Sequence, residues 1–112
     1  MNTPSQGQFR WMVFKDAKKW IGTALEFKIT IVGDDPRVVE SELQEAVLGY
    51  LESAKKLSKR FRPTQVNSVL NQKPAKEDEA RWATAHKSLR GGVLPPLSSE
   101  IYKFGVANLA VA

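Results

Sequence analysis

The residues whose types and spacing suggest chemistry most directly form a basic run near the middle of the chain. From Lys55 to Arg62 the sequence reads Lys-Lys-Leu-Ser-Lys-Arg-Phe-Arg, with five cations in eight residues and no acid. Cations contact phosphate groups, and an aromatic ring among them can stack on a base. The run therefore predicts either a solvated helix end or a surface for nucleic acid or an acidic protein face. The candidate binding residues are Lys55, Lys56, Lys59, Arg60, Phe61 and Arg62.

Other side chains that could do chemistry stand alone. His86 is the only histidine, and no acid-base partner lies near it in the sequence. Asp34 and Asp35 suit a helix cap better than a metal site, which needs more ligands. Without cysteine, the chain has no disulfide, no cysteine-zinc site and no thiol nucleophile. We therefore expect no catalytic residue, no metal site and no cofactor, and we predict that the protein is not an enzyme.

Composition and charge indicate one soluble domain with acidic partners. The chain has 112 residues, of which 42% are hydrophobic and 26% charged. The net charge is +5 and the isoelectric point is near 9.6, which favours nucleic acid or an acidic protein surface. No apolar run approaches the ~20 residues that span a bilayer, and the polar N-terminus does not resemble a signal peptide. We expect a cytoplasmic protein.

Three short strands and one long helix are predicted for the first half of the chain. Residues 1–8 are expected to form a flexible tail. Residues 9–14, 20–25 and 27–31 have the alternating pattern of strands. The link at Glu26 contains neither glycine nor proline, which leaves open a bulge or a bend. Asp35 and Pro36 are typical of a helix start. The predicted helix runs from about 36 to 60, with an apolar stripe of Val39, Leu43, Ala46, Val47, Tyr50, Ala54 and Leu57.

The second half is expected to add a helix and a strand to the same domain. The type of the 64–72 element stays open. A helix over about 76–90 is predicted to precede a loop with Pro95 and Pro96 and a final strand over about 100–107. The predicted fold class is α+β, with a three-stranded antiparallel sheet packed on one long helix. Residues 9–62 form this core, and residues 63–112 extend it.

An apolar terminal strand also predicts association between copies. Unpaired strand edges invite further pairing, so the final strand is expected to join a sheet edge, in its own chain or in a partner's. The simplest partner is a second copy related by a two-fold axis, which would give a homodimer. Trp82, Tyr102 and Phe104 are the candidate interface residues.

Three segments of the chain together resemble a known family. They read Trp-Met-Val-Phe-Lys-Asp at 11–16, Lys-Trp-Ile-Gly-Thr-Ala-Leu-Glu at 19–26 and Val-Gly-Asp-Asp-Pro at 32–36. The helix that follows contains Glu-Leu-Gln-Glu-Ala-Val at 42–47 and Tyr50 near its end. Over residues 9–58 the chain resembles the N-terminal domain of HicB-type antitoxins. The resemblance implies a β-β-β-α fold and a non-enzymatic antitoxin that sequesters a small RNA-cleaving toxin of the HicA type. The alternative is a protein that binds nucleic acid directly through residues 55–62.

Overall fold

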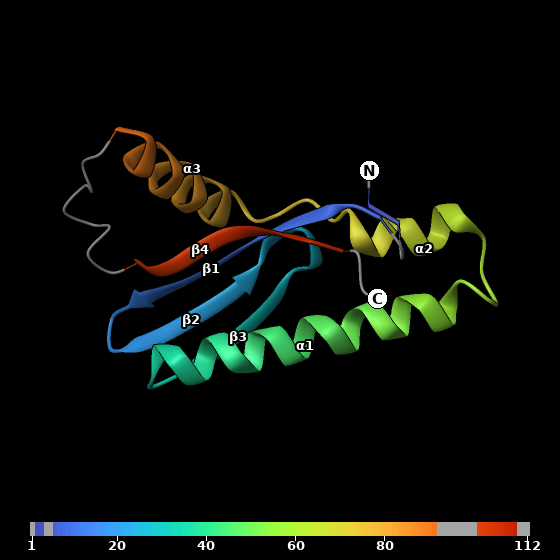
Figure 1. Cartoon of the computed structure of the whole chain (residues 1–112), viewed down its shortest axis with the longest axis horizontal. Coiled ribbons are helices and arrows are strands. Elements are labelled where there is room, and N and C mark those ends of the chain that lie inside the picture. The colour runs from blue at the N-terminus through green and yellow to red at the C-terminus, as the bar shows by residue number, and fades with distance from the viewer. Residues whose placement is uncertain (1, 4–5, 92–100, 110–112) are drawn as a thin grey trace.

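A single antiparallel sheet organises the molecule (Figure 1). The computed structural model describes residues 2–3, 6–91 and 101–109. Within them the sheet consists of β1 (Gln8–Asp16), β2 (Lys19–Ala24), β3 (Ile29–Gly33) and β4 (Ile101–Asn108), in the spatial order β3-β2-β1-β4. The predicted final strand therefore pairs with β1 of its own chain and gives a four-stranded sheet rather than a three-stranded one. Its predicted first residue, Glu100, and the loop with Pro95 and Pro96 lie outside the described residues.

Two tight turns connect the first three strands. Asp16 pairs with Lys19, so β1 and β2 are joined by a two-residue loop. β2 leads into η1 (Leu25–Phe27), a single 3₁₀ turn, and Lys28 then adopts a left-handed conformation with φ 54°. This residue reverses the chain, and β3 returns antiparallel to β2. The link at Glu26 is therefore a true turn and not a bulge or a bend in one long strand.

The long helix α1 (Pro36–Leu57) covers one face of the sheet. The carboxylate of Asp35 accepts a hydrogen bond from the Arg37 N–H at 2.9 Å, which confirms the predicted cap. Its buried stripe consists of Val39, Leu43, Val47, Leu51 and Ala54. A Cβ atom at Gly22 or Gly33 would lie 2.9 Å from the side chain of Val39, so these glycines let the helix approach the sheet closely. The helix ends three residues before its predicted end at residue 60.

The short helix α2 (Pro63–Leu70) is the element whose type the sequence left open. Val66 and Leu70 are buried in the same core cluster as the buried residues of α1. The Tyr50 hydroxyl on α1 donates a hydrogen bond to the Val69 carbonyl at 2.6 Å. It also accepts one from the Gln72 side chain at 2.8 Å. The two helices thus form a hairpin held by apolar packing and by a shared polar contact.

The helix α3 (Lys76–Gly91) packs on the opposite face of the sheet (Figure 1). Trp82 is 8% exposed and joins a second core cluster with Met12, Phe14 and Leu25. Its ring meets that of Phe104 edge to face, with 5.4 Å between the centroids. The sheet therefore has an apolar core on each face, which makes the described part of the chain a three-layer α+β domain.

The N-terminal segment is anchored at Asn2. This side chain is 6% exposed, and its amide nitrogen donates to the Leu70 carbonyl at 3.0 Å. Its amide oxygen accepts from the Gln8 N–H at 2.8 Å, and its backbone N–H donates to the Asn71 side chain at 2.8 Å. The sequence predicts a flexible tail over residues 1–8, but Asn2 is hydrogen-bonded to the end of α2.

Candidate binding surfaces

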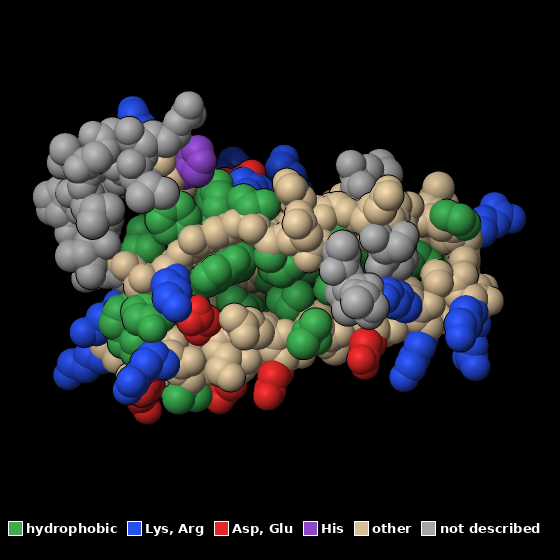
Figure 2. Space-filling model, in the orientation of Figure 1, with side chains coloured by type: hydrophobic (Ala, Val, Ile, Leu, Met, Phe, Trp, Pro, Cys, Tyr) green, Lys and Arg blue, Asp and Glu red, His purple; other side chains and the backbone are tan. Residues whose placement is uncertain are grey.

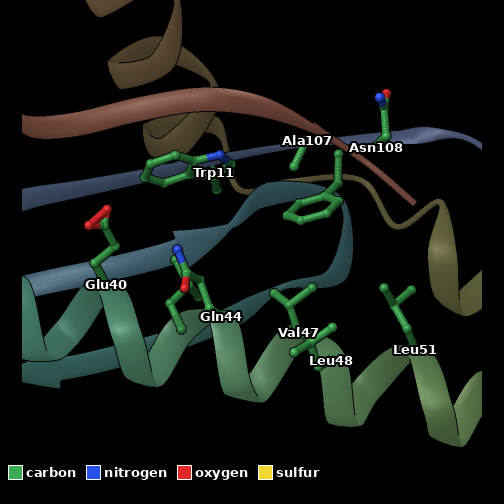
Figure 3. A pocket seen from close by; sticks show the side chains of 10 residues that line it. Trp11, Glu40, Gln44, Val47, Leu48, Leu51, Ala107 and Asn108 are labelled. Atoms are coloured by element: carbon green, nitrogen blue, oxygen red, sulfur yellow. The ribbon is translucent and has the colours of Figure 1, made fainter. Parts of the chain in front are cut away.

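An open groove separates α1 from the half of the sheet formed by β1 and β4. The helix packs mainly across β2 and β3, so its side of the other two strands is only partly covered. The cavity that results has a volume of about 320 Å³. It is lined by Phe9, Trp11, Glu40, Leu43, Gln44, Val47, Leu48, Leu51, Ala107 and Asn108, and these residues are called the groove from here on. Figure 3 shows Gln44 and Val47 of the helix pointing toward the strands, whereas the Asn108 side chain points away from the helix.

The groove combines an apolar interior with a few polar groups at its margin. Phe9, Val47 and Leu51 are buried within it, whereas the side chain of Leu48 is 51% exposed. Trp11 is half-buried, and a Cβ atom at Gly105 would lie 3.2 Å from its indole nitrogen. The absence of a side chain at position 105 therefore leaves room for the indole on the groove wall. Such a space can accept an apolar side chain or a small apolar group.

The groove itself carries little net charge, and acids that are unpaired in the described structure lie on the exposed face of α1. Its ten lining residues contain one acid and no cation. That acid, Glu40, forms an ion pair with Lys103 on β4, with 3.2 Å between the Lys103 Nζ and the Glu40 Oε1 atoms. Further along the exposed surface of α1 lie Glu42, Glu45 and Glu52, and Figure 2 shows acidic side chains along this helix. None of these three is in an ion pair within the described part of the chain. The exposed face of α1 is therefore acidic, whereas the one acid that lines the groove is paired.

The predicted binding residues lie together at the C-terminal end of α1, beyond the last groove residue of this helix, Leu51. Lys55, Lys56, Lys59, Arg60, Phe61 and Arg62 surround the connection from α1 to α2 and are called the basic turn. All are exposed except Lys55, which is half-buried. Figure 2 shows the Lys and Arg side chains projecting from this end of the molecule. The structure thus assembles the candidate residues into one surface that is separate from the groove.

The three predicted interface residues do not form one surface. Trp82 and Phe104 pack against each other on the α3 face of the sheet. Tyr102 lies against Trp20, with 6.2 Å between the ring centroids. The pairing of β1 with β4 shifts between Val13 and Phe14, and this irregularity lies beside Tyr102. Two of the candidates therefore support the fold of their own chain together, and the third belongs to another aromatic pair.

Isolated chemical groups stay isolated in the described structure. His86 is exposed on α3, and its ring stacks on Trp82 with 6.1 Å between the centroids. Asp34 pairs with Lys19 at 2.6 Å, so it ties a strand to the loop before α1. No three His, Cys, Asp or Glu side chains gather into a metal-binding group within residues 2–3, 6–91 and 101–109.

Sequence reasoning missed the groove. One available signal was the pair Phe9 and Trp11, two large apolar residues on one side of a strand. Another was Leu48, an apolar residue just outside the buried stripe of α1. Neither signal shows that the helix leaves β1 and β4 partly uncovered, because that depends on where the helix crosses the sheet.

Comparison with known proteins adds no assignment. No protein-family model matches the chain, and no curated protein or solved structure matches it significantly. Within the described residues, no helix combines the length and the apolar character needed to cross a membrane. Function has to be argued from the two surfaces.

Proposed function

We propose that the protein is a non-catalytic, HicB-like antitoxin that binds a small RNA-cleaving toxin of the HicA type in the cytoplasm. The observation that carries this proposal is the open apolar groove between α1 and the β1–β4 half of the sheet. Eight of its ten lining residues belong to residues 9–58, the β-β-β-α unit that resembles the antitoxin family. A toxin that binds RNA is expected to be basic, so the acids on the exposed face of α1 next to Leu48 complement its charge.

The groove offers the features of a partner-binding site. Leu48 and Trp11 present apolar surface that a partner would remove from water, which favours association. Gln44 and Asn108 at the margin can form hydrogen bonds that fix the partner's orientation. In protein interfaces a few buried anchors of this kind supply most of the binding energy. A cation of the toxin would contact Glu45 or Glu52, each about one helical turn from Leu48 on α1.

The proposal predicts a small basic reading frame next to the gene, and co-expression with that frame tests it. The wild-type chain is expected to relieve the growth arrest caused by that neighbour. The variant Leu48→Lys should lose this effect, because it places a cation at the groove margin where a basic partner binds. Val38→Lys is the matched control, since both residues lie on α1 and are 51% exposed, but Val38 does not line the groove.

Two results would reject the proposal. If the wild-type chain does not relieve toxicity, the protein is not an antitoxin for this neighbour. If Leu48→Lys and Val38→Lys protect equally well, the groove is not the toxin site. Circular dichroism of both variants would show that each retains its fold, so that a loss of protection can be assigned to binding.

We also propose that two copies associate through the outer edge of β4. The inner edge of this strand pairs with β1, whereas its outer edge has no neighbour in the described sheet. Sedimentation at micromolar concentration should then give the mass of two chains. Val106→Lys should weaken the dimer, and Val32→Lys on the opposite outer strand should not. These residues are 53% and 57% exposed, respectively. The mass of one chain for the wild-type protein would reject the dimer.

A further inference from the structure

The basic turn has more positive charge than a helix end requires. Cations in the last turn of a helix are stabilised by its macrodipole, and this accounts for Lys55 and Lys56. The effect falls off beyond the last turn. Lys59, Arg60 and Arg62 follow the last helical residue, Leu57, so the dipole does not explain them. Their positions need another reason.

No acid forms an ion pair with any of the five cations of the basic turn in the described residues, where the ion pairs involve other side chains. The nearest acid along α1, Glu52, lies one helical turn before Lys56, and no ion pair joins the two in the described structure. Like charges held close together repel each other and raise the local positive potential. A ligand with repeated negative charges would relieve that repulsion.

Phe61 is exposed in the middle of these cations. Half of its surface is accessible to water (50%), while Val66 and Leu70 of the adjoining α2 are buried. The backbone around it is fixed, because the N–H groups of Arg60 and Phe61 both donate to the Leu57 carbonyl at 2.9 Å. The ring is therefore presented to solvent by an ordered turn and is not used by the core.

We propose that the basic turn binds single-stranded nucleic acid. The cations contact successive phosphates, and the ring of Phe61 stacks on an unpaired base. A single strand fits better than a duplex because a paired base does not expose its face for stacking. None of the residues of the basic turn lines the groove, so the inference does not depend on toxin binding.

Fluorescence anisotropy with a labelled oligouridine of about 15 nucleotides provides the test. Phosphate contacts release counterions, so binding should weaken as salt is added. Three to five contacts predict a slope of about −2 to −3.5 for log K against log salt concentration. An oligothymidine of the same length distinguishes RNA from DNA as the ligand, and tight binding of either supports the proposal.

Charge-matched variants separate the basic turn from the overall charge. Lys56→Glu with Arg60→Glu should weaken binding at least tenfold and reduce the salt slope by about 1.4. Lys18→Glu with Lys87→Glu is the control. It makes the same change in net charge at two exposed lysines outside the basic turn, and it should retain binding within about twofold.

Variants of Phe61 test the stacking contact separately. Phe61→Ala should weaken binding about tenfold, because it removes the ring that stacks on a base. Phe61→Trp keeps an aromatic ring and should restore the wild-type affinity. Since Phe61 is not part of the core, both variants are expected to retain the wild-type circular dichroism spectrum and thermal midpoint.

Several results would overturn the inference. Absent binding, or binding that does not depend on salt, would exclude phosphate contacts. Equal losses of affinity in the two double variants would show that binding depends on the net charge of the protein and not on the basic turn. Duplex binding as tight as single-strand binding, with no effect of Phe61→Ala, would exclude stacking. If polyglutamate displaces the oligonucleotide as well as unlabelled oligouridine does, the surface binds an acidic protein instead. Leu48→Lys should bind the oligonucleotide normally, which separates this surface from the groove.

Discussion

Arg10 and Glu26 form an ion pair that joins β1 to η1. The guanidinium Nη2 lies 2.6 Å from the Glu26 carboxylate, and the Nε atom lies 2.8 Å from the same oxygen. The other carboxylate oxygen accepts the Arg10 backbone N–H at 2.6 Å. Arg10 also pairs with Glu79 of α3 and lies over the ring of Trp82, 5.8 Å from its centroid. One side chain thus links a strand, a turn and a helix.

Replacing Glu26 by glutamine should destabilise the fold. The substitution removes the charge that accepts three hydrogen bonds from Arg10, and hydrogen bonds to charged groups contribute about 1.5–3 kcal/mol. We expect a loss in the free energy of unfolding within this range, measured by urea denaturation. Glu79→Gln is the control, because the Glu79 side chain is 46% exposed. Its loss in the free energy of unfolding should stay below about 1 kcal/mol. An equal loss in both variants would contradict the stabilising role of the Arg10–Glu26 ion pair.

Gly22 lets α1 approach the sheet closely, because it has no side chain. A methyl group at this position would lie 2.9 Å from Val39, which is fully buried and cannot move aside easily. Gly22→Ala should therefore destabilise the protein by about 1–3 kcal/mol. Gly49→Ala on α1 is the matched control, because its methyl group meets nothing within 4 Å. Alanine is the better helix former, so this variant should gain about 0.5–1 kcal/mol in a thermal unfolding experiment. Destabilisation by both variants would argue against the packing explanation.

The N-terminal half could be predicted because its signals are local. Alternation along residues 27–31 defines a strand, and Asp35 with Pro36 defines a helix start without any tertiary contact. The burial of Val39 and Leu43 confirms the first turns of the helix stripe, whereas Leu57 at its predicted end is 39% exposed. Each of these features depends on residues a few positions apart in the chain, which is the range that sequence patterns report.

Other features depend on contacts that are distant in sequence. α2 has only eight residues and is too short to be stable alone, and its place is fixed by the contact of Tyr50 with Val69. In the turn between β2 and β3, the residue with a left-handed backbone conformation is Lys28 and not a glycine. The groove arises because the close contact of Gly22 and Gly33 with Val39 places α1 across β2 and β3. Among the site residues, the basic turn was predictable from composition, whereas the groove was not.

The two-residue loop between β1 and β2 should be improved by glycine. Ala17 has φ 57°, and of the non-glycine residues described only Ala17 and Lys28 have positive φ. A left-handed conformation costs an L-residue about 1–2 kcal/mol, and glycine avoids this cost. After the larger entropy loss of glycine is subtracted, Ala17→Gly should gain about 0.5–1 kcal/mol in urea denaturation. Lys18→Gly is the control and should gain nothing, since Lys18 is not left-handed. A gain of the same size at both positions would point to general loop flexibility.

Tyr50 should make the stability of the protein depend on pH in the alkaline range. Burial raises the pKa of its hydroxyl above the ordinary value of 10.0, and the hydrogen bond from Gln72 offsets part of this effect. Below pH 10 the hydroxyl keeps its proton in the folded and unfolded states, and its hydrogen bond to Val69 contributes about 1 kcal/mol. As pH rises further, the unfolded chain loses this proton first, which favours unfolding.

Comparison with Tyr50→Phe isolates this effect from the titration of lysines, which both proteins share. At neutral pH the wild-type protein should be the more stable by about 1 kcal/mol. Urea denaturation from about pH 8 to about pH 11 should show this advantage decreasing above the ordinary tyrosine pKa. It should vanish as pH passes the raised pKa of the folded state. A difference that stays constant or grows over this range would mean that the Tyr50 hydroxyl is not buried against Val69 and Gln72, and that another contact holds α2 on α1.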